Sequence, residues 1–185
     1  LAVIERFSFL YSHCLIPLNS NEYLLIGGNS NQGISDKTFL YNFKLGVWKT
    51  GPSLIFARNS HACGIMVVNT KRVAVVTGGL SQDGALDSTE FLNLELMENW
   101  EIGPELPMVM SGHKMVSLGD SVVIIGGYFS GYNLGRYLNE LYQLSCHVSG
   151  NFCQWYEMPQ KLDFPRKNHL VQLIPDSLAL CNQSN

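Results

Sequence analysis

Four histidines recur at regular spacing and are the residues of this sequence that most suggest a chemical site. They lie at intervals of 48, 52 and 56 residues, at His13, His61, His113 and His169. Imidazole is the commonest metal ligand in proteins, so a metal centre is one hypothesis. Residues that recur with a repeat lie at corresponding places in successive units, where they would satisfy backbone groups at the start of a strand. We favour this structural role and predict no metal site.

Catalytic and cofactor-binding motifs are absent from the sequence. It contains neither GxSxG nor HExxH, and its carboxylates are scattered without a recurring pair. The stretch "GGYFSGYNLG" at residues 126–135 lacks the GxGxxG spacing, and no GK[ST] occurs. We therefore predict no catalytic residues, no cofactor and no nucleotide site.

Two of the five cysteines, Cys146 and Cys153, bracket the short segment "HVSGNF" just before Trp155. If they face each other across a hairpin, a disulfide is feasible, and the protein would then belong to an oxidising, extracellular compartment. The alternative is a pair of reduced thiols in a cytoplasmic protein. The localisation stays open between these two.

Composition indicates an ordered globular protein and excludes some partners. Only 15% of the 185 residues are charged, against about a quarter in average domains, and the net charge is −3. No run of Lys and Arg exists, so nucleic acid is not an expected partner. No uncharged apolar run approaches the roughly 18 residues that span a bilayer, so we predict no membrane span.

Three sets of residues share one period near 50. Apolar runs end in the glycine pairs Gly27–Gly28, Gly78–Gly79 and Gly126–Gly127, with spacings of 51 and 48. The tryptophans Trp48, Trp100 and Trp155 follow at spacings of 52 and 55. The segments "LYNFKL" (40–45), "FLNLEL" (91–96) and "LYQLSC" (141–146) align between them. Together with the histidines, these markers establish an internal repeat.

Each unit reads as four short strands. In the second unit these are "HACGIMVV" (61–68), "VAVVTGG" (73–79), "TEFLNLEL" (89–96) and "WEIGPEL" (100–106). No segment has helical periodicity with caps. An all-β fold with four strands in about 50 residues is typical of a propeller blade. We predict one repeat region over residues 1–185, with blades at about 12–55, 60–107 and 112–160 and a partial blade at 166–185.

The glycine pairs have a physical explanation in such a fold. The second strand of a blade is covered on both faces by neighbouring blades, so it is apolar throughout. Glycine then allows a positive φ and a close backbone approach where the chain turns. We expect the tryptophan of the last strand to pack over this gap.

These residues resemble the kelch repeat. The family pattern has an Arg and a His before the first strand, a Gly-Gly ending the second, a Tyr in the third and a Trp opening the fourth. The matching residues are Arg58, His61, Gly78, Gly79, Tyr41, Tyr142 and the three tryptophans. The resemblance implies a kelch-type β-propeller, here a partial ring of four-stranded antiparallel blades. It departs from the pattern at "YNF", "LNL" and "YQL", and "LALCN" (178–182) replaces the fourth Gly-Gly.

The resemblance also implies a function. In kelch propellers that bind partners, the loops joining strands two to three and four to one share one face. We therefore predict a non-catalytic module that binds another protein through these loops, with candidate residues Asn29, Arg58, Leu80, Tyr128, Phe129, Tyr132, Arg136 and Arg166. Two alternatives are a galactose-oxidase-like propeller enzyme with its catalytic residues outside this chain, and the substrate-recognition part of a BTB-kelch ubiquitin ligase adaptor.

Overall fold

The computed structural model describes residues 10–131, 134–147 and 152–174, and all regular elements in these ranges are β-strands. The first two sheets each have four antiparallel strands. The first has the order β1 (Cys14–Pro17), β2 (Glu22–Ile26), β5 (Thr38–Asn42) and β6 (Val47–Thr50). The second contains β7 (Ala62–Val68), β8 (Lys71–Thr77), β11 (Thr89–Asn93) and β12 (Trp100–Ile102). The predicted four-stranded units are thus present.

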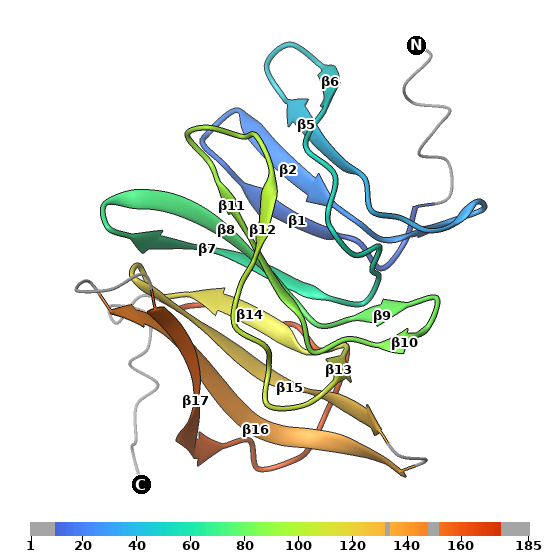
Figure 1. Cartoon of the computed structure of the whole chain (residues 1–185), viewed down its shortest axis with the longest axis vertical. Coiled ribbons are helices and arrows are strands. Elements are labelled where there is room, and N and C mark those ends of the chain that lie inside the picture. The colour runs from blue at the N-terminus through green and yellow to red at the C-terminus, as the bar shows by residue number, and fades with distance from the viewer. Residues whose placement is uncertain (1–9, 132–133, 148–151, 175–185) are drawn as a thin grey trace, which may run out of the picture.

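The third sheet has five strands because its first strand is divided in two. Both β13 (Met110–Ser111) and β14 (Lys114–Ser117) pair with β15 (Ser121–Gly131), which is followed by β16 (Leu134–His147) and β17 (Phe152–Lys161). Figure 1 shows the three sheets following one another along the long axis, from β1–β6 to β13–β17. No helix that could cross a membrane occurs in the described ranges.

The connections between second and third strands are hairpins. In the first two units they form the separate pairs β3 (Asn29–Ser30) with β4 (Gly33–Ile34) and β9 (Leu80–Ser81) with β10 (Gly84–Ala85). In the third unit the hairpin continues β15 and β16. All three point to the same side of the molecule, on the right in Figure 1.

Two hydrophobic clusters fill the gaps between the sheets. The first joins Ile16, Leu24 and Ile26 to residues of the second sheet such as Trp100. The second joins Met66 and Val75 to the third sheet, including Trp155. Each of these tryptophans reaches back to the preceding sheet: Trp100 Nε1 donates to the Pro52 carbonyl at 3.0 Å, and Trp155 Nε1 donates to the Pro104 carbonyl at 3.2 Å. The repeated Gly-Pro therefore supplies the acceptor for the next sheet's tryptophan.

The glycine pairs are contact points between consecutive units. The backbone N–H groups of Gly28, Gly79 and Gly127 donate to the carbonyls of Arg58, Met110 and Arg166, each at 2.8 Å. Gly27 has φ 56°, and a Cβ there would lie 2.6 Å from the Arg58 carbonyl oxygen and 2.9 Å from His61 Cε1. The next unit's histidine therefore fills the gap, and the prediction that the tryptophan does so is wrong.

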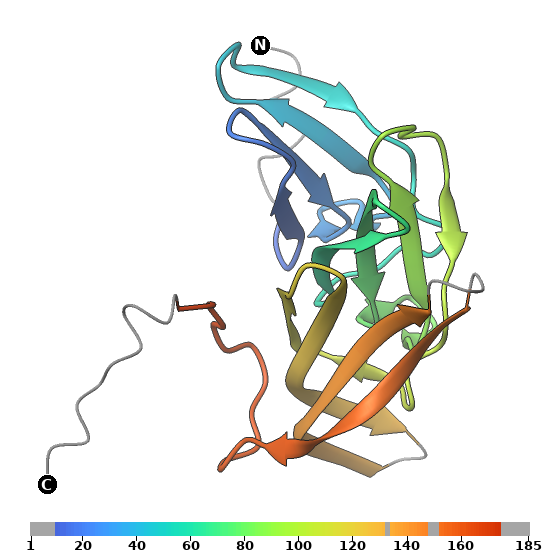
Figure 2. The ribbon, with the colours of Figure 1, turned by 90° about the vertical axis from the view of Figure 1, so that its left-hand side faces the viewer.

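A chain of backbone hydrogen bonds links the units further. Ser60 N–H donates to the Ser12 carbonyl at 2.9 Å, Gly112 N–H to the Ser60 carbonyl at 2.8 Å, and Asn168 N–H to the Gly112 carbonyl at 2.8 Å. All four residues have φ between 52° and 66°. In the described part of the fourth unit, residues 166–174, no strand forms (the red segment after β17 in Figure 2). By its hydrogen bond, Asn168 nevertheless takes the place that Ser60 and Gly112 take earlier.

The histidines are mainly space-filling groups. His61 and His113 are buried, and His113 Nε2 lies 2.9 Å from Thr77 Oγ1. Thr77 corresponds to Ile26 in the first unit, which has no hydroxyl, and neither ring nitrogen of His61 has a hydrogen-bond partner. The Ile26 backbone lies near enough to the His61 ring to raise its pKa slightly against the effect of burial, but the geometry of a hydrogen bond is not met. The expectation that the histidines satisfy backbone groups is thus not met at His61.

Arg58, predicted to bind a partner, is instead fully buried. Its Nη2 lies 2.6 Å from Glu90 Oε1, and its Nη1 donates to the Gly78 carbonyl at 2.7 Å. The Glu90 carboxylate also accepts the N–H groups of Ile55 and Phe56 at 2.7 and 3.1 Å. Burial lowers the pKa of the guanidinium, and Glu90 opposes that shift. Because a buried charge must be paired, Arg58 holds its own sheet together and is unavailable to a partner.

The third unit replaces this ion pair by apolar contacts. Met110 occupies the place of Arg58, since each carbonyl accepts from the second glycine of the preceding pair. Tyr142 occupies the place of Glu90, since Tyr142 pairs with Ile124 as Glu90 pairs with Val76. Both Met110 and Tyr142 are buried. The predicted alignment of Tyr142 with Tyr41 is therefore wrong by two residues, because Leu144 pairs with Trp155 as Tyr41 pairs with Trp48.

Two disulfides are present. Cys146–Cys153 joins β16 to β17 with a Cα–Cα distance of 4.0 Å, so this predicted disulfide is confirmed. Cys14–Cys63 joins β1 to β7, and hence the first sheet to the second, with a Cα–Cα distance of 6.1 Å. We did not predict this second pair. Its signal was the separation of 49 residues, which is close to the repeat period.

The buried ion pair generates a stability prediction. Removing one partner, in Arg58→Met or Glu90→Tyr, leaves an uncompensated buried charge and should cost about 3–5 kcal/mol. The double variant copies Met110 and Tyr142 of the third unit and should lose far less than the sum of the single changes. Urea unfolding of the four proteins measures this coupling. Additive losses would contradict the interpretation.

The buried histidines generate a pH prediction. Burial is the largest cause that lowers the pKa of both His61 and His113 to about 3. Between about pH 6 and pH 4 the unfolded chain binds these protons and the folded chain does not. Each histidine should therefore reduce the free energy of unfolding by about 1.4 kcal/mol per unit of falling pH. In urea titrations at several pH values, His113→Gln should show a slope shallower by that amount, and an unchanged slope would refute the assignment.

Candidate functional site

The hairpins and the loops that enter each new unit form one face, which we call the loop face. Its hairpins are β3–β4, β9–β10 and the β15–β16 tip. The entering loops pack beside them: Leu54 N–H donates to the Asp36 carbonyl, and Leu106 N–H to the Asp87 carbonyl. The two loop sets that we predicted to share a face are therefore neighbours.

A pocket of about 570 Å³ opens on the loop face between the second and third sheets. It draws on three connections: the β10–β11 link, the β12–β13 loop and the β15–β16 hairpin. Its lining residues are Asp87, Pro107, Met108, Val109, Phe129, Gly131 and Arg136. Phe129 also packs against the hydrophobic cluster between these two sheets. The pocket therefore has an apolar floor fixed to the core and one charge of each sign.

The cation of this pocket is held in position. Arg136 Nη2 lies 2.6 Å from Glu140 Oε1, four residues further along β16. The hydrogen bond that Arg136 donates to Glu140 is the largest cause that raises the pKa of Arg136. Half of the Arg136 side chain stays exposed. The guanidinium can therefore meet a ligand while Glu140 fixes its orientation.

An aromatic cluster with a lysine lies on the same hairpin. The rings of Tyr128 and Tyr137 meet edge to face with centroids 5.2 Å apart. Lys167 Nζ lies 4.4 Å from the Tyr128 centroid and 5.5 Å from the Tyr137 centroid. Tyr137 is 52% exposed. Such a group offers a partner both apolar area and a positive charge.

The structure separates the predicted candidates. Phe129 and Arg136 share the pocket, and Tyr128 belongs to the aromatic cluster. Asn29 and Leu80 are half-buried, and each forms an isolated β-bridge with a residue just before the first strand of its own unit, at Tyr11 and Asn59. Arg166 is exposed, and its Nε donates to the Phe164 carbonyl at 3.1 Å. Tyr132 lies outside the described residues. Arg58 is excluded by its burial.

Sequence reasoning missed the apolar side chains of the entering loops. Ile55 and Phe56 are 47% and 42% exposed, and Phe164 is 71% exposed. Phe56, Met108 and Phe164 each lie two residues before the position shared by Arg58, Met110 and Arg166. This recurrence in the sequence was the signal that could have revealed them.

No metal site is evident in the part of the chain that the structure describes. No group of three or more His, Cys, Asp or Glu side chains there could hold an ion. His61 packs against Gly27 and Gly79, and His113 against Gly78 and Gly127, so each of these two rings lies between the glycine pairs of consecutive units.

Comparisons with known proteins agree with this architecture. No family model matches the chain. The chain is 26% identical over 119 residues to Kelch-like protein 41b of Danio rerio. This alignment covers 64% of the present chain and 19% of the relative. A solved structure, "Structure of YjhT", superimposes with a TM-score of 0.66 at 16% identity, covering 85% of this chain and 54% of the other. The chain thus spans about a fifth of the first relative and about half of the second. With its period near 50, its glycine pairs and its stacked antiparallel sheets, the chain is similar to kelch-repeat proteins and has the fold of a kelch-type β-propeller.

Proposed function

We propose that this chain is a non-catalytic module that binds another protein through its loop face. The observation that carries the proposal is the pocket lined by Met108, Phe129 and Arg136, because three separate connections converge on it. Interface cores are enriched in aromatic residues, Met and Arg, and depleted of Lys and Glu. The pocket contains Met108, Phe129 and Arg136, which are of the enriched types, beside one acidic residue, Asp87.

The scaffold supports such a role because it is rigid while its loops carry the variable side chains. The sheets are joined through buried clusters and inter-unit hydrogen bonds. Ile55 and Phe56, in the loop that enters the second unit, and Phe164, in the loop that enters the fourth, are further exposed apolar side chains. The pocket lies at the loop between them in the sequence, the one that enters the third unit. A partner that inserts an apolar side chain into the pocket could contact these residues without reorganising the sheets.

We further propose that the protein works in an oxidising, extracellular compartment. Cys14–Cys63 and Cys146–Cys153 support this proposal, since disulfides persist there and are rare in the cytosol.

The loop-face proposal predicts a separation of binding from stability. Tyr137→Ala and Phe56→Ala should weaken partner binding at least about fivefold, since exposed aromatic anchors contribute to affinity. Their melting temperatures should stay near that of the unmodified protein, because both side chains are substantially exposed. Phe43→Ala is the matched control: Phe43 is 71% exposed but lies beside the β5–β6 turn, away from the loop face.

A photo-reactive residue in place of Tyr137 or Phe43 identifies the partner without assuming it. Cross-linking to one protein from Tyr137 alone, weakened by Phe56→Ala, agrees with the proposal. Cross-linking of that protein from Phe43 alone would contradict it.

The compartment proposal predicts the thiol count and the stability of the secreted protein. Four of the five cysteines should be paired, so alkylation of the denatured, unreduced chain should modify one cysteine. By loop-closure entropy, Cys14→Ala/Cys63→Ala should cost about 4 kcal/mol and Cys146→Ala/Cys153→Ala about 2.5 kcal/mol. Mass spectrometry and urea unfolding measure the two effects. Five free thiols in protein taken from its natural source would overturn the proposal.

A further inference from the structure

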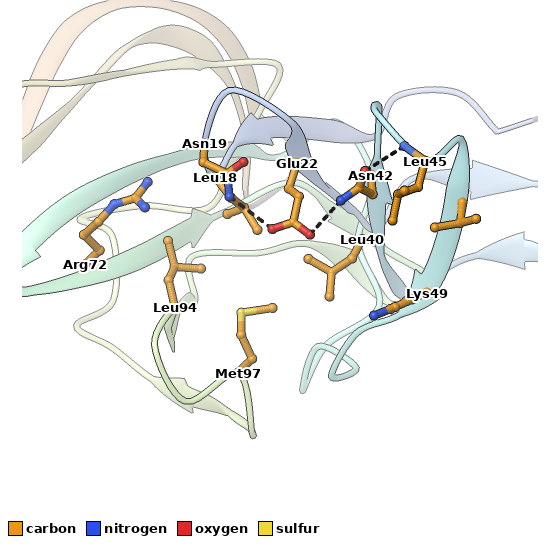
Figure 3. A pocket seen from close by; sticks show the side chains of 11 residues that line it. Leu18, Asn19, Glu22, Leu40, Asn42, Leu45, Lys49, Arg72, Leu94 and Met97 are labelled. Atoms are coloured by element: carbon orange, nitrogen blue, oxygen red, sulfur yellow. Dashed lines mark hydrogen bonds between the residues drawn. The ribbon is translucent and has the colours of Figure 1, made fainter.

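A second cavity lies at the opposite end of the sheets from the loop face. It is a groove of about 250 Å³ between the first and second sheets, beside the β1–β2 and β5–β6 turns. Its floor is apolar and consists of Leu18, Leu40, Leu94 and Met97, which also pack against the buried cluster between these sheets. Figure 3 shows these side chains converging on the groove from both sheets.

Two cations flank this apolar floor. Lys49 of β6 and Arg72 of β8 line opposite sides of the groove, with Leu94, Met97 and Leu40 between them (Figure 3). Both side chains belong to exposed residues. Neither takes part in an ion pair within the described ranges. Lys49 acts on Glu22 at longer range and contributes to the lowering of its pKa, but neither cation is held by an ion pair, so both can meet a ligand.

The single carboxylate of the groove is already occupied. Glu22 accepts from Asn19 Nδ2 at 3.1 Å through Oε2 and from Asn42 Nδ2 at 3.2 Å through Oε1. These amide hydrogen bonds, Asn19 first, lower the pKa of Glu22, so it stays ionised at neutral pH. Two cations and one anion leave the groove with a net charge of +1.

The fold does not require this charge. Lys49 follows Trp48 as Glu101 follows Trp100, and Arg72 precedes Gly78 by six residues as Asp120 precedes Gly126. At the corresponding places of the next gap, between the second and third sheets, the chain therefore has two acids. Since the repeat scaffold accepts either sign, the basic pair is particular to the first gap.

The first gap is also cross-linked. Cys14–Cys63 joins the same two sheets, and Cys14 packs in the same cluster as the apolar floor. A covalent tie holds the groove walls at a fixed separation, which reduces the ordering cost of binding.

We propose that this groove binds a small α,ω-dicarboxylate. Its methylene chain lies over the Leu18, Leu40, Leu94 and Met97 floor, one carboxylate meets Arg72, and the other meets Lys49. A cavity of about 250 Å³ corresponds to the liquid volume of roughly eight waters, which suits a molecule of octanedioate size. Two anionic ends complement two cations that an apolar floor keeps apart.

The test compares three ligands of equal chain length on the oxidised, full-length protein. Isothermal titration at low salt should show octanedioate binding at least about threefold more tightly than octanoate and about tenfold more tightly than 1,8-octanediol. The advantage over the diol should shrink as ionic strength rises to about 0.5 M. Equal affinity for the diacid and the diol, or no saturable binding of the diacid at millimolar concentration, would overturn the proposal.

Variants locate the site. Lys49→Gln and Arg72→Gln should each reduce octanedioate affinity to that of octanoate, while leaving octanediol binding unchanged. The matched controls Glu101→Gln and Asp120→Asn alter the corresponding places of the second gap and should change octanedioate affinity less than about twofold. All four side chains are exposed, so melting temperatures should agree with that of the unmodified protein. Loss of binding in the controls equal to that in the groove variants would show that only overall charge matters. The proposal does not depend on loop-face binding, because the cavities lie at opposite ends of the sheets.

Discussion

The contact on which the rest of the structure depends is made at the paired glycines. There the N–H of the second glycine donates to the residue that begins the next unit, and the first glycine leaves room for that unit's histidine. A side chain at Gly27 would collide with the Arg58 carbonyl and the His61 ring. This close approach sets the spacing of the sheets, and the inter-sheet clusters and the tryptophan hydrogen bonds follow from it.

The same scaffold tolerates different chemistry at equivalent places. Arg58 and Glu90 form a buried ion pair in the second unit, whereas Met110 and Tyr142 fill those places in the third. Pro107 stands where Ile55 stands in the preceding loop, so one of the N–H groups that Glu90 accepts is missing there. The backbone contacts recur from unit to unit, whereas the side chains do not. The loop face and the opposite end of the sheets can therefore present different side chains.

Those two ends differ in character. The loop face joins aromatic and apolar side chains to a single oriented guanidinium, which suits a protein partner. The groove at the other end is small, cross-linked and flanked by two unpaired cations, which suits a small anion. We therefore propose two separate recognition sites on one set of sheets.

The sequence by itself determined the period and the all-β class, because both follow from local spacing. It offered the Cys146–Cys153 disulfide as one of two alternatives, and the shared loop face through the resemblance to the kelch repeat. Only the tertiary structure decided that Arg58 is buried, that His61 and not a tryptophan covers Gly27, and that Cys14 meets Cys63. These three outcomes depend on how one unit packs against the next. Strand pairing also placed Leu144, and not Tyr142, where Tyr41 lies in the first unit. Side-chain burial and register are properties of strand pairing over long separations, and a one-dimensional pattern does not fix them.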